Sequence, residues 1–171
     1  MQDITLTPTE IQLINTFIFQ PCGLTMAHRR YEQESQEYDA QNFDLDHLKI
    51  KYRKAKITPK KIGQFVTLWY RDAAGITTPY AGSNPIDFYI IATRKDNDFG
   101  LFIFPRSILS KHGILRGECK AGKRGFRVYP NWDIAENKQA KQTQLWQKLY
   151  FIEILAGEEV DLKKAKQLLT L

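Results

Sequence analysis

The sequence predicts an α/β protein in which helices flank a mixed sheet, and three observations support this fold class. An amphipathic segment near the N-terminus has helical spacing, a series of short apolar or alternating segments follows, and helical patterns return in the C-terminal third. The chain has 171 residues, of which 43% are hydrophobic and 26% are charged. These values suit one globular domain, which we expect to span residues 1–171.

The first helix is predicted from Thr7 to Phe19. Thr7 would be its N-cap and Pro8 its first helical residue, and apolar side chains then recur at helical spacing until Pro21 ends the pattern. A second helix, or a helix-like turn, is predicted over residues 29–43, because this segment is rich in Glu and Gln and has no Gly or Pro.

Strands are predicted from residue 47 onward. In residues 47–58 apolar residues alternate with cations, so one face should lie in the core and the face with Lys51 and Arg53 in solvent. A turn joins this strand to the next one in a hairpin, and a loop follows over residues 75–85. Further strands are predicted at residues 64–70, 86–94 and 99–105.

The C-terminal third alternates between helix and strand. Residues 106–113 predict a short helix that ends at Gly113, and residues 125–130 predict a strand. Residues 135–155 predict the longest helix, with Gln144 and Gln147 on its surface. Its apolar stripe is expected to contain Ala140, Leu145, Leu149 and Ile152. A terminal helix is predicted over residues 159–171, with Asp161 as its cap.

The charges are unevenly distributed along the chain, which has a formal net charge of +6. One block of cations without acids extends from Lys49 to Lys61, and a second, interrupted only by Glu118, extends from Lys111 to Arg127. Such segregation can build one positive face, which favours a polyanionic partner. Nucleic acid is the first candidate, and a protein with an acidic surface is the second.

Several other classes find no support in the sequence. No run of eighteen apolar residues predicts a membrane span, and the N-terminus has no secretory signal pattern, so we expect a cytoplasmic protein without membrane contact. Cys22, Cys119 and the three histidines are scattered, without the paired spacing that a tetrahedral zinc site uses.

Four segments resemble the MepB-like family, a group of largely uncharacterised bacterial proteins. They are "ESQEY", "RKAKITPKKIGQFVTLWYR", "GLFIFPRSIL" and "GKRGFRVYPNWD" followed by "AKQTQLWQKLYF", and together they extend from about residue 30 to residue 151. A helix is expected on either side of this region. The resemblance implies a restriction-endonuclease-like core, similar to that of the PD-(D/E)XK nucleases.

That core implies a test for a Mg²⁺ site. Such nucleases use an acid on one strand and an acid-x-Lys pattern on the next, which hold Mg²⁺ and assist cleavage of a phosphodiester. Asp87 is the candidate first acid, but the following strand has no acid-x-Lys pattern. Glu37 is therefore the candidate for a migrated metal ligand, and Lys56 or Lys60 for the missing catalytic lysine. The alternatives are a strand-end cap for Asp87 and a solvated helix face for Glu37.

The cations also predict a phosphate-binding site. Near the turn at Thr58 and Pro59, both faces of the strand have cations, which fits an anion site better than a solvated edge strand. The residues expected to bind phosphate are Arg53, Lys56, Lys60, Arg71, Lys123, Arg124 and Arg127. The aromatic residues Phe126, Tyr129 and Trp132 have two interpretations, stacking on unpaired bases or packing in the core, and we favour the core.

The leading hypothesis is a nuclease-fold protein that binds nucleic acid, or another phosphate-bearing ligand, through a basic pocket. Metal-dependent cleavage, and the choice between DNA and RNA, stay open at this stage. The alternative is a non-catalytic binding or regulatory module for an acidic protein partner.

Overall fold

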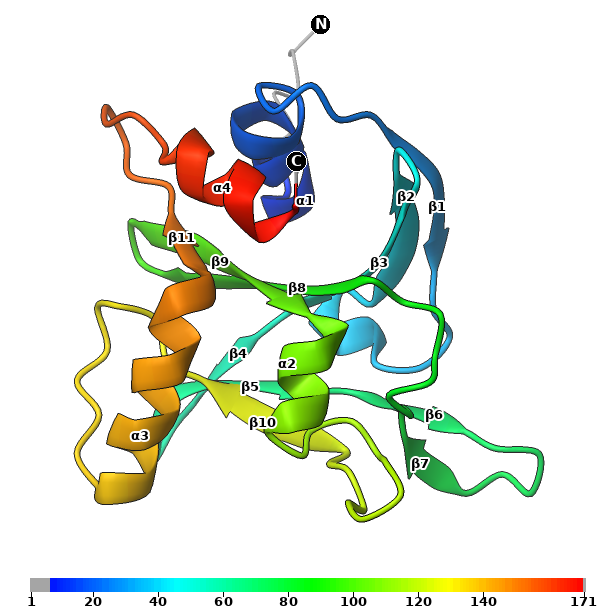
Figure 1. Cartoon of the computed structure of the whole chain (residues 1–171). Helices are drawn as coiled ribbons and strands as arrows, with labels where there is room; N and C mark the ends of the chain where they lie inside the picture. The colour runs from blue at the N-terminus through cyan, green and yellow to red at the C-terminus, as the bar shows by residue number, and fades with distance from the viewer. Residues whose placement is uncertain (1–6, 171) are drawn as a thin grey trace, which may run out of the picture.

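The computed structural model describes residues 7–170 (Figure 1). A six-stranded mixed sheet lies at its centre, with neighbouring strands antiparallel except for β3 and β8, which are parallel. In spatial order its strands are β1 (Met26–Tyr31), β2 (Gln41–Leu45), β3 (Leu48–Lys54), β8 (Phe88–Lys95), β9 (Asp98–Pro105) and β11 (Phe151–Glu153). The predicted fold class, a mixed sheet flanked by helices, is confirmed.

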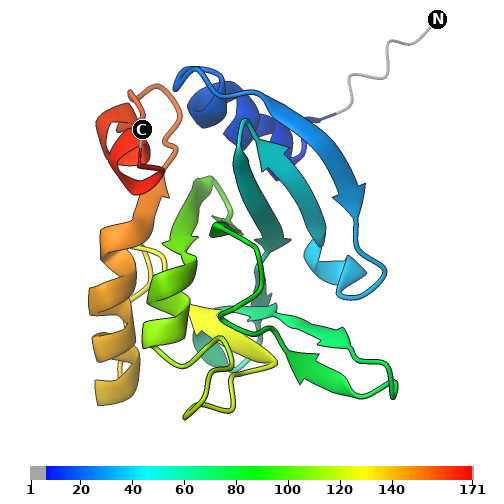
Figure 2. The same cartoon turned by 45° about the vertical axis from the view of Figure 1, so that its right-hand side comes forward.

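Two smaller sheets lie below the central sheet in Figure 1. One has the order β10-β5-β4, and the other is a hairpin of β6 and β7 that extends away from the body of the protein (Figure 2). These strands are β4 (Lys56–Thr58), β5 (Lys61–Thr67), β6 (Trp69–Arg71), β7 (Thr77–Pro79) and β10 (Gly125–Val128). The predicted hairpin is confirmed only between β4 and β5, because the predicted strand over residues 47–58 divides into β3 of the central sheet and β4 of the smaller one. The strand β7 lies in a segment predicted to be a loop.

Each face of the central sheet buries its own apolar core. On one face, α1 (Glu10–Ile14), the π-helical segment η1 (Asn15–Phe19) and α4 (Leu162–Leu168) pack against the strands. On the other, the core lies between the strands, the β10-β5-β4 sheet, α2 (Arg106–Lys111) and α3 (Lys138–Gln147). Because β8 and β9 are covered on both sides, they consist of nearly continuous apolar residues.

Local signals predicted several helix ends correctly. Gly113, with a φ of 69°, ends α2 at the predicted place, and the Asp161 carboxylate caps α4 by accepting a hydrogen bond of 2.9 Å from the Lys164 N–H. The first helix was predicted to begin two residues too early, whereas its end at Phe19 is correct. Its N-cap is Thr9, not Thr7, and the Thr9 N–H donates to the Gln12 side chain at 2.8 Å.

Of the two alternatives predicted for residues 29–43, the helix is wrong, and a helix-like turn is present only at Gln36–Tyr38. Residues 29–43 form the end of β1, a single 3-10 turn η2 (Gln36–Tyr38) and the start of β2. Ser35 and Asp39, on either side of η2, have φ values of 58° and 49°, and this left-handed conformation does not continue into a helix. The chain instead reverses so that β1 pairs with β2, which satisfies the backbone of both strands.

The longest helix was also mispredicted in part. It ends at Gln147 and continues through a 3-10 turn η3 (Lys148–Tyr150) into β11, which pairs with β9. The predicted apolar stripe is only half right: Ala140 and Ile152 are buried, but Leu145 is 67% exposed, and Gln147, predicted to lie on the surface, is fully buried. Buried backbone groups near α3 need hydrogen-bond partners, and glutamine supplies them where leucine cannot.

In residues 7–170, no helix combines the length and the apolar character that crossing a membrane requires.

Candidate functional site

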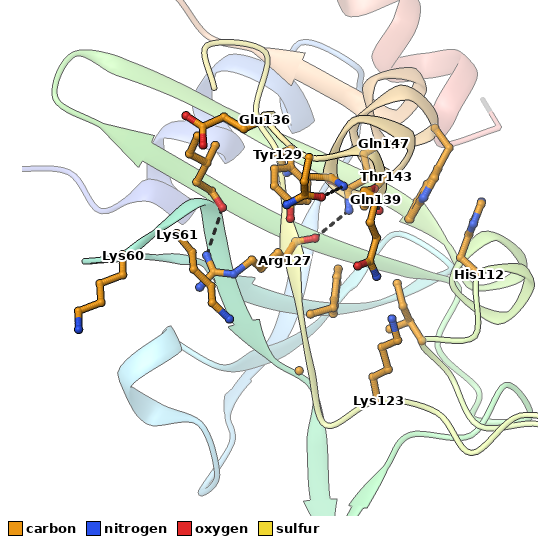
Figure 3. Close-up of a pocket in the computed structure, with 17 residues that line it drawn as sticks. Lys60, Lys61, His112, Lys123, Arg127, Tyr129, Glu136, Gln139, Thr143 and Gln147 are labelled. Atoms are coloured by element: carbon orange, nitrogen blue, oxygen red, sulfur yellow. Dashed lines mark hydrogen bonds between the residues drawn. The ribbon is translucent and has the colours of Figure 1, made fainter. Parts of the chain in front are cut away.

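A pocket of about 570 Å³ lies between the β10-β5-β4 sheet and α3 (Figure 3). Its floor is apolar and includes Ile62, Ile114 and Phe126. Its walls come from the β4–β5 turn, the residues after α2, the start of β10 and the inner side of α3. A volume of this size is typical of sites for small molecules or for one unit of a larger ligand.

Four cations line this pocket, two from each basic block of the sequence. Lys60 lies in the β4–β5 turn and Lys61 begins β5, while Lys123 precedes β10 and Arg127 belongs to it. The pairing of β10 with β5 brings the two blocks together. In Figure 3 the ammonium group of Lys60 points away from the other labelled side chains, so Lys61, Lys123 and Arg127 supply the charge that faces the pocket.

Arg127 is held in place by the hairpin. Its guanidinium donates to the Thr58 hydroxyl at 2.6 Å and to the Gly63 carbonyl at 3.2 Å. Lys61 and Lys123 are exposed, and neither has an acidic partner within residues 7–170. The charges of these two lysines are therefore available to a ligand, whereas the guanidinium of Arg127 is positioned by the Thr58 hydroxyl and by backbone carbonyls of β5.

The wall formed by α3 is fixed by two buried glutamines that were predicted to lie on the surface. The Gln147 amide donates to the Arg127 carbonyl at 2.9 Å and accepts from the Tyr129 N–H at 2.8 Å. Gln144 donates to the carbonyls of Pro130 and Asp133 at 3.0 and 2.8 Å. These bonds join α3 to β10 and to the loop after it, so the helix and the cationic strand keep a fixed separation.

The end of the pocket opposite Lys61 and Arg127 is aromatic, because His112, which follows α2, meets Trp146 of α3 there. The His112 ring stacks on the Trp146 indole with ring centres 3.9 Å apart and planes within 7° of parallel. Burial, together with the neighbouring cations Lys111 and Lys120, lowers the pKa of His112, so its ring is neutral at pH 7. In Figure 3, Lys61 and Arg127 lie on one side of the pocket and His112 on the other.

The other predicted phosphate-binding residues lie outside this pocket. Arg53 is completely buried, Lys56 lies over the Tyr38 ring at 4.9 Å, and Arg71 pairs with Glu34 at 3.1 Å. The Arg124 guanidinium donates to the Thr77 carbonyl at 2.8 Å and so binds the β6–β7 hairpin. Of the aromatic residues, Phe126 is buried in the core as favoured, and Trp132 is partly buried against it.

Asp87 and Glu37, the predicted Mg²⁺ ligands, do not come together. The Asp87 carboxylate accepts a hydrogen bond of 2.8 Å from the Lys49 N–H at the start of β3, as a strand-end cap does. Glu37 is exposed on η2. Its neighbour Tyr38 contacts Lys56, which lies just beyond the C-terminal end of β3. At about 3.3 Å per residue, the part of β3 from Lys49 to Lys54 is about 17 Å long, so Asp87 and Glu37 lie at opposite ends of this strand.

The residues present therefore do not fit the metal site that the family resemblance implies. Within residues 7–170, no group of three or more His, Cys, Asp or Glu side chains could hold a metal ion. Lys56 and Lys60, the candidate catalytic lysines, are both exposed.

The structure contains a buried charged cluster that the sequence pattern did not reveal. The Glu32 carboxylate is ion-paired with both Lys51 and Arg53, whose side chains are 5% and 0% exposed. Asn42 donates to Glu32 at 2.8 Å, and the Lys51 ammonium lies 4.3 Å from the centre of the Tyr80 ring. The prediction that Lys51 and Arg53 face solvent is wrong, because β3 is covered on both faces.

The charges in this cluster shift each other's protonation. Burial would raise the pKa of Glu32, but the charges of Arg53 and Lys51 outweigh it and lower the pKa. Burial lowers the pKa of Lys51 to about 8, against the opposing effect of Glu32. Burial also raises the pKa of Tyr80 to about 12. The sequence contained no signal for this role of Glu32. It lies among acids that resemble a solvated face, so its position does not distinguish it from them.

The pKa of Lys51 predicts that the cluster stabilises the protein more as pH rises from 8 to 9.5. In this window the unfolded chain still protonates Lys51, whose pKa there is about 10.4, while the folded chain releases the proton, so raising pH favours the folded state. The unfolding free energy of the wild type minus that of Lys51→Met should grow by about 1–2 kcal/mol across this window. Urea denaturation at several pH values measures it, and a constant difference would contradict the assignment.

Comparisons with known proteins agree with the family resemblance. The model of the MepB-like family matches residues 32–153. A solved structure described as the crystal structure of MepB superposes with a TM-score of 0.75 and 33% sequence identity, covering 90% of this chain and 99% of that one. The comparison with curated proteins finds no significant match.

A second solved structure, of the bacterial homing endonuclease I-Ssp6803I, has a TM-score of 0.41 and 15% identity over 77% of this chain and 82% of that one. At this TM-score the likeness supports no conclusion, and the restriction-endonuclease-like core stays a prediction of the family resemblance.

Proposed function

The chain belongs to the MepB-like family, and since this name specifies no chemistry, we propose a function from the site alone. The basic pocket binds a phosphate-bearing ligand, and nucleic acid is the favoured class. The observation that supports this proposal is the convergence of Lys61, Lys123 and Arg127 on one concavity. Glu136 is the one acid among the residues that line it.

The three cations suit phosphate in complementary ways. Arginine offers a planar fork of donors and lysine a compact charge, and both form charge-assisted hydrogen bonds with phosphate oxygens. Because Arg127 is already oriented by Thr58 and Gly63, a ligand would not have to order that side chain on binding. The proposal is one of binding and contains no cleavage step.

The double variant Lys61→Ala/Lys123→Ala tests the proposal. Fluorescence anisotropy with a labelled single-stranded RNA and a labelled DNA duplex should show binding that weakens log-linearly as salt rises. For the RNA, loss of two phosphate contacts should weaken binding about tenfold at low salt and reduce the salt slope by about 1.4, at about 0.7 per contact. Both lysines are exposed, so the variant is expected to fold normally.

Lys163→Ala is the matched control, because Lys163 is an exposed lysine on α4 and does not line the pocket. It should bind like the wild type apart from a small effect of net charge. Equal affinities for the wild type and the double variant would contradict the proposal. Binding of polyglutamate, with no binding of either nucleic acid, would instead support the alternative of an acidic protein partner.

A further inference from the structure

The pocket has two chemically different ends. Lys61 and Arg127 lie at one end, and the stacked pair of His112 and Trp146 lies at the other, with Lys123 on the rim between them (Figure 3). A site for inorganic phosphate alone needs cations but no flat aromatic surface. A site for an apolar ring alone needs no cations. The two ends together match a ligand with an anion at one end and a planar ring at the other.

We propose that the pocket holds one nucleotide, an inference that rests on the proposed function. The phosphate of this nucleotide lies toward Lys61 and Arg127, and its unpaired base lies against the His112–Trp146 wall. Every base has an aromatic face, so stacking on this wall does not depend on base identity. A volume of about 570 Å³ lies within the range that binding sites for small molecules occupy.

Polar groups between the two ends suit the sugar and the edge of the base. Gln139 and Thr143 line the pocket from α3, and in Figure 3 the amide of Gln139 and the ammonium of Lys123 point toward each other. Amide and hydroxyl groups can both donate and accept hydrogen bonds, as sugar hydroxyls and base edges require. The apolar residues of the floor, Ile114 and Phe126, exclude water beneath the ligand.

A duplex fits this arrangement poorly. Its bases are stacked inside the helix, so a concave site would reach only its phosphates and the aromatic wall would stay without a partner. Unpaired nucleotides present the base face that such a wall can contact. The nucleotide can be a free nucleoside monophosphate or an unpaired nucleotide of a single strand, since both present the same phosphate, sugar and base.

Isothermal titration calorimetry with adenosine monophosphate, adenosine and inorganic phosphate tests the inference. Adenosine monophosphate should bind more tightly than either of its parts. His112→Ala should weaken its binding about tenfold, the loss expected when a stacking partner is removed, and should leave phosphate binding unchanged. His112→Phe retains a stacking ring and should restore the affinity. The exposed His47, in the β2–β3 turn, provides the matched control His47→Ala, which should bind like the wild type.

A 5′-phosphorylated single-stranded hexanucleotide and a duplex of the same sequence distinguish the sources. If the single strand binds more tightly than the free nucleotide and His112→Ala weakens it, the ligand is an unpaired nucleotide within a strand. If phosphate binds as tightly as adenosine monophosphate, or if the duplex is preferred and His112→Ala has no effect, the inference is overturned while the proposed phosphate site stands. If none of the probes binds, both fail.

Discussion

Replacing Glu32 by Gln is expected to lower the free energy of unfolding by about 3–5 kcal/mol, because it leaves the buried cations Lys51 and Arg53 without a counter-charge. The substitution keeps the shape of the side chain, so lost packing contributes little. Urea denaturation followed by circular dichroism at pH 7 measures the loss, which is a large fraction of the stability of an ordinary domain.

Glu34→Gln is the matched control, since Glu34 lies two residues away and pairs with Arg71, whose side chain is 53% exposed. A surface pair of this kind contributes at most about 1 kcal/mol. The double variant Glu32→Gln/Lys51→Met should be less destabilised than the sum of the two single variants, because each partner is costly mainly when the other remains. Additive losses, or a Glu32→Gln loss no larger than that of the control, would show that the three charges do not act as one cluster.

The second large effect is expected at Gln147. Replacing it by Leu leaves the Arg127 carbonyl and the Tyr129 N–H without their partner in a buried position, and each unpaired group costs about 1–3 kcal/mol. We therefore expect a total loss of about 2–6 kcal/mol in the free energy of unfolding. Because Gln147 also joins the two walls of the pocket, ligand binding should weaken even where the variant is fully folded.

Gln142→Leu provides the comparison, because Gln142 is exposed on the same helix. It should change stability by no more than about 0.5 kcal/mol. Denaturation curves and binding isotherms for both variants separate the two effects of Gln147. A Gln147→Leu variant as stable as Gln142→Leu would show that the backbone groups find other partners, and the pocket would then not depend on this residue.

The cluster at Glu32 and the pocket at Arg127 differ in how far they could be predicted. The sequence pointed to Lys60, Lys123 and Arg127 through the two cation blocks, and the structure places all three on one pocket. It pointed equally to Arg53 and to Arg124, yet Arg53 is buried in an ion pair and Arg124 binds backbone. A count of charges along the chain does not distinguish these outcomes.

The reason is that exposure of a strand residue depends on what covers the strand. The alternation in residues 47–58 correctly showed which side of β3 holds Ile50 and Tyr52, because that pattern follows from backbone geometry alone. Whether the other side meets water depends on Glu32, which follows β1, and on Tyr80, and both are distant from β3 along the chain. The same holds for Gln147, whose partners belong to β10.

Local patterns in the sequence were sufficient to predict the class of fold and the strands β8 and β9. They also predicted the C-terminal end of α2 at Gly113 and the N-cap of α4 at Asp161, because each of these features depends on residues only a few positions apart. The burial of Lys51 and the change from helix to strand between α3 and β11 could be seen only in the tertiary structure, because both arise from contacts between segments that are remote in the sequence. The meeting of Lys61 and Lys123 on one pocket also needed the folded chain, because the pairing of β5 with β10 brings the two basic segments together.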